Sequence, residues 1–260
     1  MIDTHAHLNF QQYEGEVGAV LGRAEKKGVK KFIVPSSNLK TSKKAISLAR
    51  KYPEVFAAVG IHPLHANEMS IENLQQFYTI LSAPKVVGVG EIGLDYFYLD
   101  KVSKTAEYPS KKEQKIVLVE MFKLAMDAQL PLILHCRQAY PDLLDILRNE
   151  GVEGPGVIHC FMGNLEEAKK FLDLGFFISF AGNLTYSDSL VDLVNFVPLD
   201  KLLLETDCPY LTPEPFRGKK NEPAFMIEIA KKIAEIKGIS LVEVEKVTTK
   251  NAEKLFKLKA

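Results

Sequence analysis

Two histidines one residue apart are the first side chains of the chain that could do chemistry. They are His5 and His7, in the stretch Asp3-Thr4-His5-Ala6-His7. Alternate side chains of an extended strand point to the same face, so we expect both imidazoles to point the same way. Two neutral imidazoles make half of a site for a divalent metal ion. The pair therefore predicts a metal site, provided that more ligands arrive from elsewhere in the chain.

Further ligand types stand at the ends of other apolar runs. They are His62 and His65 after a third run, Glu91 after a fourth, His135 after a fifth, His159 after a sixth and Asp207 after an eighth. Any one histidine could be structural, but these four together with His5 and His7 are all six histidines of the chain. So many nitrogen and oxygen donors exceed the needs of one tetrahedral ion and indicate two ions. Glu91 is the natural bridge, because a carboxylate can give one oxygen to each ion.

The elements that must bring these residues together alternate between strands and helices. The expected strands are 2–7, 32–35, 56–61, 86–91, 132–135, 157–159, 176–180 and 202–205. The expected helices are 16–27, 42–52, 71–81, 110–128, 141–149, 165–174, 189–196, 223–237 and 241–257. This alternation predicts a (β/α)8 TIM barrel of the α/β class, whose strand ends converge on one mouth. A doubly wound open sheet is the alternative, but the Gly-rich phosphate motif that it usually carries is absent.

Composition limits the class of protein. The 260 residues are 47% hydrophobic and 25% charged, and no linker-like stretch divides them, so we expect one domain over residues 1–260. No leader-like segment and no apolar run near the roughly 18 residues of a membrane span is present, which predicts a cytoplasmic protein that contacts no membrane. Three cysteines without a C-x-x-C spacing argue against a disulfide framework. The net charge of zero predicts no broad electrostatic attraction of nucleic acid.

Seven short motifs carry a resemblance to a known family. They are Asp3-Thr4-His5-Ala6-His7, Gly60-Ile61-His62-Pro63, Gly90-Glu91-Ile92-Gly93-Leu94-Asp95, Leu134-His135-Cys136-Arg137, His159-Cys160-Phe161-Met162-Gly163, Leu204-Glu205-Thr206-Asp207-Cys208-Pro209 and Arg217-Gly218-Lys219-Lys220-Asn221-Glu222-Pro223. In this order, and over nearly the whole chain, the sequence resembles the TatD-type metal-dependent deoxyribonucleases of the amidohydrolase-like barrel superfamily. Met162 stands where a small Ser is common in the family, and the segment 98–110 is longer than usual.

The resemblance implies a role for each site residue. One metal ion would be held by His5, His7, Glu91 and Asp207, and a second by Glu91, His135 and His159. The resemblance also implies that His62 and Arg137 lie near the scissile phosphate. His65 lies one residue beyond the place where many members have a second histidine after the proline.

The expected mechanism is hydrolysis by a water that the metal pair acidifies and that attacks phosphorus in line. Asp207 would orient this water and take its proton, with Glu91 as the other catalytic carboxylate. Arg137 can place two donors on one phosphate, and Glu205 is expected to orient a metal ligand. Ligand types leave Mg²⁺, Mn²⁺ and Zn²⁺ open.

The expected substrate is DNA or an oligonucleotide, cleaved as by a 3′-5′ exonuclease on single-stranded ends, and a monomer is favoured. Basic residues that could follow a backbone are Lys101, Lys104, Lys111, Lys112, Lys115, Arg217, Lys219 and Lys220. Tyr96, Phe97 and Tyr98 offer faces on which bases could stack. Two alternatives stay open: hydrolysis of a carboxylic or aminoacyl ester or a cyclic amide at the same metal pair, and a scaffold protein without activity.

Overall fold

Within residues 1–99 and 108–258, which this computed structural model describes, eight strands form one parallel sheet in the order of the sequence. They are β1 (Ile2–Asp3), β2 (Lys31–Val34), β3 (Val55–Val59), β4 (Val86–Asp95), β5 (Leu132–Arg137), β6 (Gly156–Ile158), β7 (Phe177–Phe180) and β8 (Leu202–Leu204). Each strand pairs in parallel with the next, and a helix lies between consecutive strands. The (β/α)8 barrel predicted from the sequence is confirmed.

The barrel closes through the residues that follow β1 and β8. The N–H of Thr4 donates to the carbonyl of Leu204 over 3.1 Å, and the N–H of Asp207 donates to the carbonyl of His5 over 2.9 Å. The N–H of His7 in turn donates to the carbonyl of Cys208 over 2.9 Å. β1 is therefore shorter than the expected strand 2–7, yet the chain stays paired as far as His7. These bonds fix the histidine pair against the segment that carries Asp207.

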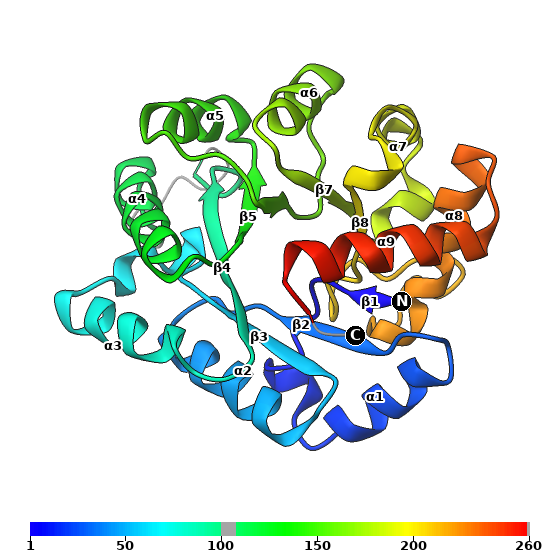
Figure 1. Ribbon diagram of the computed structural model, residues 1–260, viewed down its shortest axis with the longest axis horizontal. Helices are drawn as coiled ribbons and strands as arrows, with labels where there is room; N and C mark the ends of the chain where they lie inside the picture. Colours follow the sequence, from blue (N-terminus) through cyan, green and yellow to red (C-terminus); the bar gives the residue numbers. More distant parts are fainter. Residues whose placement is uncertain (100–107, 259–260) are drawn as a thin grey trace.

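Helices surround the sheet, as Figure 1 shows. The α-helices are α1 (Val17–Glu25), α2 (Leu39–Lys51), α3 (Ile71–Leu81), α4 (Lys111–Ala128), α5 (Tyr140–Asn149), α6 (Leu165–Asp173), α7 (Val191–Phe196), α8 (Met226–Lys237) and α9 (Leu241–Leu255). The 3-10 helices are η1 (Gln11–Tyr13), η2 (Pro63–Glu68), η4 (Gly182–Tyr186), η5 (Asp188–Leu190), η6 (Leu199–Lys201) and η7 (Pro223–Phe225). The side chains of Asn38, Ser110 and Asn164 cap α2, α4 and α6, because each accepts a hydrogen bond from a first-turn N–H.

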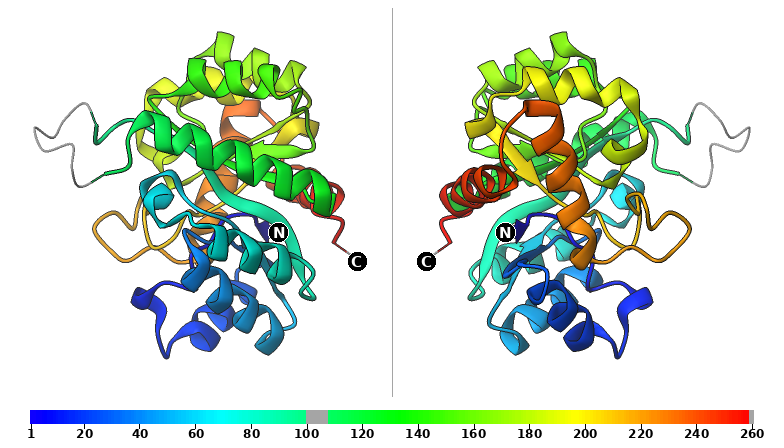
Figure 2. Two further views of the ribbon diagram at one scale, coloured as in Figure 1. Left: turned by 90° about the vertical axis from the view of Figure 1, so that its left-hand side faces the viewer. Right: turned by 90° about the vertical axis from the view of Figure 1, so that its right-hand side faces the viewer.

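Apolar side chains fill the barrel and close one of its ends. The inward-facing residues are Ile2, Ile33, Ala58, Ile133, Val157, Phe177 and Leu203. Leu255, Phe256 and Leu258, from α9 and the residues after it, belong to the same buried cluster. α9 crosses one end of the barrel in Figure 1, and in Figure 2 it lies at the end opposite the segment between β8 and η7. With the amino-terminal end closed, the carboxyl end is left for a site.

Two strands run further than the sequence pattern predicts. β4 reaches Asp95 instead of ending at Glu91, and β5 reaches Arg137 instead of His135. The two extensions pair with one another, with Asp95 opposite Arg137. Among the described residues, no helix is long and apolar enough to cross a bilayer. Cys136, Cys160 and Cys208 are free thiols and buried.

Candidate metal centre

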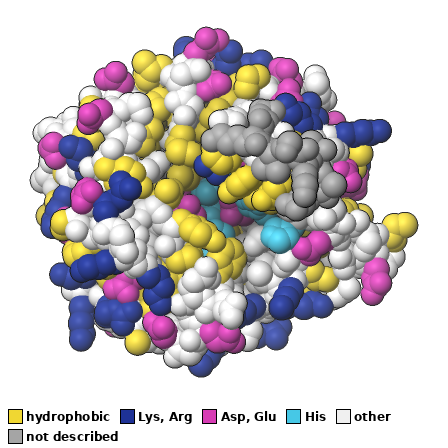
Figure 3. Space-filling view, turned by 180° about the vertical axis from the view of Figure 1, so that it is seen from behind, with side chains coloured by type: hydrophobic (Ala, Val, Ile, Leu, Met, Phe, Trp, Pro, Cys, Tyr) yellow, Lys and Arg dark blue, Asp and Glu magenta, His cyan; other side chains and the backbone are white. Residues whose placement is uncertain are grey.

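A hollow of about 500 Å³ opens at the carboxyl ends of the strands. Figure 3 looks onto this face and shows histidine and acidic side chains deep in the hollow, with hydrophobic side chains around them. Its lining includes His7, Glu91, His135, His159 and Asp207, which come from five different strand ends. The fold thus brings together residues that lie up to 200 positions apart in the sequence.

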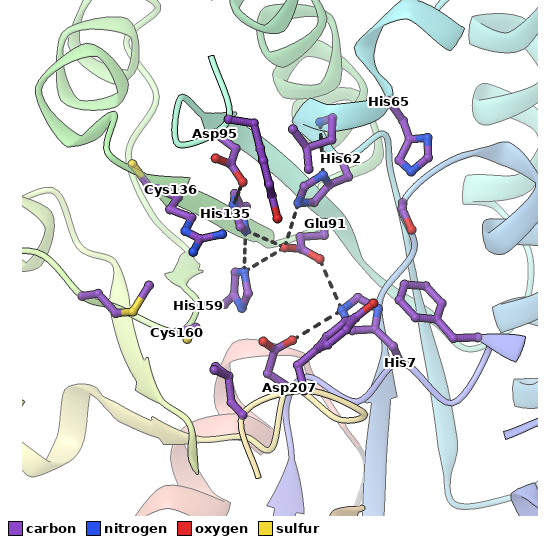
Figure 4. Close-up of a pocket in the computed structure, with 18 residues that line it drawn as sticks. His7, His62, His65, Glu91, Asp95, His135, Cys136, His159, Cys160 and Asp207 are labelled. Atoms are coloured by element: carbon purple, nitrogen blue, oxygen red, sulfur yellow. Dashed lines mark hydrogen bonds and ion pairs between the residues drawn. The ribbon is translucent and has the colours of Figure 1, made fainter. Parts of the chain in front are cut away.

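Glu91 is at the centre of this arrangement, as Figure 4 shows. The register of the β4–β5 pairing shifts between Val89 and Ile92, and such irregularities re-aim side chains. Across the end of β3, the N–H of Glu91 donates to the carbonyl of Ser36 over 2.8 Å. The Glu91 backbone is thereby anchored, and its side chain, only about 5% exposed, extends among the histidines.

One oxygen of Glu91 faces the imidazoles of β5 and β6. Oε1 of Glu91 lies 2.7 Å from Nδ1 of His135 and 2.8 Å from Nε2 of His159. These two nitrogens are 3.0 Å apart. The three atoms form a compact donor set, which we call the β5–β6 set.

The other oxygen of Glu91 faces the histidine pair near the start of the chain. Oε2 of Glu91 lies 3.3 Å from Nε2 of His5 and 3.5 Å from Nε2 of His7. Oδ1 of Asp207 is 3.8 Å and 3.5 Å from the same two nitrogens, which are 3.1 Å from each other. These four atoms form a second donor set, the β1–β8 set. Glu91 therefore contributes one oxygen to each set.

The donors of both sets fit divalent metal ions. Ligands about 2.1 Å from one ion lie roughly 3.0 to 3.4 Å from each other, and the separations in the two sets, from 2.7 to 3.8 Å, extend to either side of that range. Within the described residues, the ligand atoms of His5, His7 and Asp207 lie within 4.8 Å of one another, as do those of Glu91 and His135. Mixed imidazole and carboxylate donors are also the ligand types that zinc and manganese accept.

The carboxylates of the centre are ionised. Burial alone would raise the pKa of Glu91, but the neighbouring imidazoles, that of His159 above all, lower it well below the usual value. Burial likewise opposes ionisation of Asp207, whereas a hydrogen bond with His7 and the nearby imidazoles lower its pKa. Two buried negative charges in one small hollow favour the binding of cations.

Carboxylates behind two of the histidines determine which nitrogen faces the centre. Oδ2 of Asp95 is 3.3 Å from Nε2 of His135, and Oε1 of Glu205 is 3.3 Å from Nδ1 of His159. In the neutral form of each ring, a proton on the outer nitrogen satisfies the carboxylate and leaves a lone pair on the nitrogen that faces Glu91. The hydroxyl of Ser179 also donates to Oε2 of Glu205 over 2.6 Å.

In His62, the nitrogen that faces the centre carries the proton. Its Nδ1 accepts a hydrogen bond from the N–H of Leu64 over 3.1 Å, so the proton of the neutral ring is on Nε2. Burial lowers the pKa of His62 to about 3, which keeps the ring neutral. Nε2 lies 3.5 Å from Oε1 of Glu91. His62 therefore presents an N–H to the hollow and not a lone pair.

Arg137 lies where this hollow meets a second one. Its guanidinium is 3.5 Å from the ring centroid of Phe97, and it lines both hollows together with Cys136 and Met162. The second hollow has a volume of about 520 Å³ and extends toward the start of α6. The space around the donor sets thus continues past Arg137.

Other residues considered in the sequence lie outside the donor sets. His65 is at the rim, where its Nδ1 is 2.7 Å from Oε1 of Glu68, and Figure 4 shows it apart from Glu91. Of the predicted backbone-binding lysines, Lys115 pairs with Asp142 and Lys220 with Glu16. Lys101 and Lys104 lie outside the described residues.

Asp95 is the site residue whose contact with His135 we did not predict. In the sequence analysis it appears only as the last residue of the motif that begins at Gly90. The signal that could have identified it is its place four residues after Glu91, because residues i and i+4 of a strand share a face.

A (β/α)8 barrel with imidazole and carboxylate donors at its carboxyl mouth has the architecture of a metal-dependent hydrolase. The model of the family described as TatD related DNase matches residues 2–257, so the chain belongs to this family and is a metal-dependent hydrolase. The resemblance inferred from the motifs is confirmed.

Relatives of known sequence or structure support the same membership. The chain is 38% identical to the uncharacterized metal-dependent hydrolase YabD of Bacillus subtilis, over 99% of both chains. It is 31% identical to a protein of Erwinia tasmaniensis named 3′-5′ ssDNA/RNA exonuclease TatD, over 99% of this chain and 100% of that one. The crystal structure of YjjV, a TatD homologue from Escherichia coli, has a TM-score of 0.91 and 33% identity, covering 100% of this chain and 98% of that chain.

Proposed function

We propose that the chain is a divalent-metal-dependent phosphodiesterase that removes nucleotides from single-stranded 3′ ends of DNA. The observation that carries this proposal is the orientation of the Glu91 carboxylate, whose two oxygens face two separate donor sets. The chemistry that divalent ions supply in such a pair is polarisation of a phosphoryl oxygen and a lower pKa for bound water.

We assign the β1–β8 set to one ion and the β5–β6 set to the other. His5, His7 and Asp207 would share the first ion with Oε2 of Glu91, and His135 and His159 would share the second with Oε1. The lone pairs that Asp95 and Glu205 direct toward Glu91 support the second assignment. Two ions, drawn from Mg²⁺, Mn²⁺ and Zn²⁺, are part of this proposal.

Asp207 is the proposed proton acceptor. Its side chain is 14% exposed, more than that of Glu91, so it can reach a water in the hollow. Its lowered pKa keeps it ionised and able to orient that water. The N–H of His62 would donate to a phosphoryl oxygen, which agrees with a substrate contact and not with metal binding.

Features around the donor sets favour a nucleic-acid substrate over a small ester. Arg137 can give two parallel hydrogen bonds to a phosphate, and the second hollow beyond it leaves room for the next residue of a polymer. Tyr98, Phe10 and Tyr210 line the first hollow and offer aromatic faces for unpaired bases. The relative named as a 3′-5′ ssDNA/RNA exonuclease supports the same substrate class.

Turnover of 3′-labelled single-stranded DNA with Mg²⁺, Mn²⁺ or Zn²⁺ tests the proposal, beside a panel of carboxylic esters and lactones. We expect metal-dependent release of mononucleotides from the labelled end. Ester or lactone turnover without nucleotide release would replace the proposal with a carboxylic or aminoacyl ester or cyclic amide hydrolase. Release of internal fragments would indicate an endonuclease and contradict the exonuclease.

Replacing Arg137 with lysine should lower kcat/KM for the DNA substrate about 10- to 100-fold. Lysine keeps the positive charge but cannot place two parallel donors on one phosphate. Steady-state kinetics on 3′-labelled DNA measures the effect. The same replacement at the exposed Arg148 on α5 is the matched control and should leave kcat/KM unchanged. Equal kinetics for Arg137→Lys and the wild type would contradict the phosphate contact.

Replacing Glu205 with glutamine should weaken metal binding about tenfold. The side-chain oxygen of glutamine can still accept a hydrogen bond from the Nδ1–H of His159, but the lost negative charge makes that imidazole a poorer electron donor to the metal. Metal titration followed by the melting temperature measures this without relying on activity. Glu72→Gln, on the exposed side of α3, serves as the control. An unchanged metal titration of Glu205→Gln would contradict a role of Glu205 in metal binding.

A further inference from the structure

Basic residues are concentrated in one part of this neutral chain. Residues 22–53 contain ten of the 33 Lys and Arg residues but only one acidic residue, Glu25. The rest of the chain therefore has 23 basic and 32 acidic residues. Five of the ten basic residues are on α2, and the other five lie between Arg23 and Lys31.

On α2 these residues form a stripe along one side of the helix. The α2 basic stripe consists of Lys40, Lys43, Lys44, Arg50 and Lys51. The spacings of three, four and eleven residues place Lys43, Lys44 and Lys51 on the same side as Lys40. The opposite side, with Ala45 and Ala49, is buried against the barrel. Four residues of the stripe are exposed and Lys44 is half-buried.

The stripe lacks the acidic partners that lysines have on α6 and α8. On α6, Lys170 pairs with Glu166 at 2.6 Å, and on α8, Lys231 pairs with Glu228 at 2.9 Å. In the part of the chain that the structure describes, no carboxylate pairs with any residue of the stripe. Lys43 instead donates to the neutral amide of Gln76 over 2.7 Å.

This arrangement opposes the stability of the helix. Like charges three or four residues apart destabilise a helix by roughly 0.2 to 0.5 kcal/mol per pair. Lys40 also lies in the first turn, where the helix dipole disfavours positive charge, and that turn contains no acidic residue. An external anion would relieve both effects.

The stripe begins beside the hollow that holds the donor sets. Ser37, three residues before Lys40, lines the hollow, and its carbonyl accepts a hydrogen bond from the N–H of His62 over 2.9 Å. From there the 13 residues of α2 continue for about 20 Å along the flank of the barrel. In Figure 3, Lys and Arg side chains border the lower edge of the face that contains the hollow.

We propose that the α2 basic stripe binds the phosphate backbone of a single-stranded nucleic acid whose 3′ end occupies the hollow. The inference rests on the proposed function and adds the path of the strand beyond the cleaved end. Lysine ammonium groups suit contacts that do not depend on sequence, because each acts as a point charge on a phosphate. Lys115 and Lys220 were also expected to contact a nucleic-acid backbone, but both already form ion pairs.

The test compares two triple variants that each lose three positive charges. One is Lys40→Gln, Lys43→Gln and Lys44→Gln, at the mouth end of α2. The control is Lys246→Gln, Lys250→Gln and Lys254→Gln, on the exposed side of α9 at the opposite end of the barrel. Fluorescence anisotropy measures binding of phosphorothioate oligothymidylates of 4 and 16 nucleotides between 50 and 300 mM KCl. Circular dichroism checks that both variants are folded.

We expect the wild type and the α9 control to bind the 16-mer more tightly than the 4-mer. The α2 variant should bind the 16-mer about tenfold more weakly at 50 mM KCl, and the slope of log affinity against log salt should fall by about two. Wild-type affinity in the α2 variant, equal weakening in both variants, or no gain from the 4-mer to the 16-mer would overturn the proposal.

A separate assay distinguishes failure of the stripe from failure of the proposed function. Cleavage of a dinucleotide by the wild type, without any effect of the α2 variant on the 16-mer, would refute the stripe alone. Binding of the 16-mer by the stripe with no cleavage of any phosphodiester would refute the phosphodiesterase. Stripe-dependent binding to phosphatidylserine vesicles but not to the 16-mer would reject nucleic acid as the partner.

Discussion

Glu91→Gln is expected to lower kcat/KM on single-stranded DNA by roughly 10³- to 10⁵-fold, the range seen when a central catalytic residue is removed. The carboxylate has both of its oxygens within 3.5 Å of imidazole nitrogens from four strand ends. A glutamine keeps the shape but loses the charge and can offer only one oxygen as a ligand. One replacement should therefore weaken both donor sets together.

The variant should remain folded, because glutamine is nearly the same size as glutamate. Its melting temperature in the absence of metal is the check on this point. The buried neighbour Asp3 offers a comparison, since it bonds to the N–H and hydroxyl of Thr206 and lies outside both donor sets. Loss of activity in Asp3→Asn should follow loss of stability, whereas loss in Glu91→Gln should not. Wild-type turnover by folded Glu91→Gln would refute the bridging role.

Removal of divalent ions should abolish turnover and lower the melting temperature. Metal binds the folded chain, in which the five ligand strand ends converge, and not the unfolded chain, in which they are far apart. At an ion concentration of 100 times Kd the stabilisation is about 2.7 kcal/mol, which for a chain of this length corresponds to roughly 5 to 10 °C. Differential scanning calorimetry after chelation, and after the ion is added back, measures the change.

The same titration on Glu91→Gln is the control for the metal effect. That variant should show a much smaller shift, because each donor set has lost an oxygen. A chelated wild type that melts at the same temperature and still releases nucleotides would contradict a metal centre made of these residues. Comparison of Mg²⁺, Mn²⁺ and Zn²⁺ in this assay also identifies the ion that the centre prefers.

Local sequence patterns were sufficient to predict the barrel, because strands and helices have different periods of apolar residues. The ends of the strands were less accurate where pairing with a neighbour decides them. β4 and β5 continue to Asp95 and Arg137 because the two extensions pair with each other. β1 ends at Asp3, since beyond it the chain pairs with the residues that follow β8.

The sequence was also sufficient to predict that the proposed metal ligands converge, namely His5, His7, Glu91, His135, His159 and Asp207. Each of these residues follows an apolar run, and the carboxyl ends of barrel strands meet at one mouth. His65 satisfied the same rule but lies at the rim beside Glu68, because η2 carries it away from the centre. The position of a side chain within a loop depends on turn geometry, which its residue type alone does not specify.

The sequence by itself determined the fold class, the residue types of the centre and the density of positive charge on α2, because these follow from local order along the chain. Only the tertiary structure decided that Glu91 faces two donor sets, that Asp95 supports His135 and that His62 presents an N–H. It also decided that the basic stripe begins beside the hollow. Distances and hydrogen-bond directions arise between residues far apart in sequence, so they exist only after the strands have closed into a barrel.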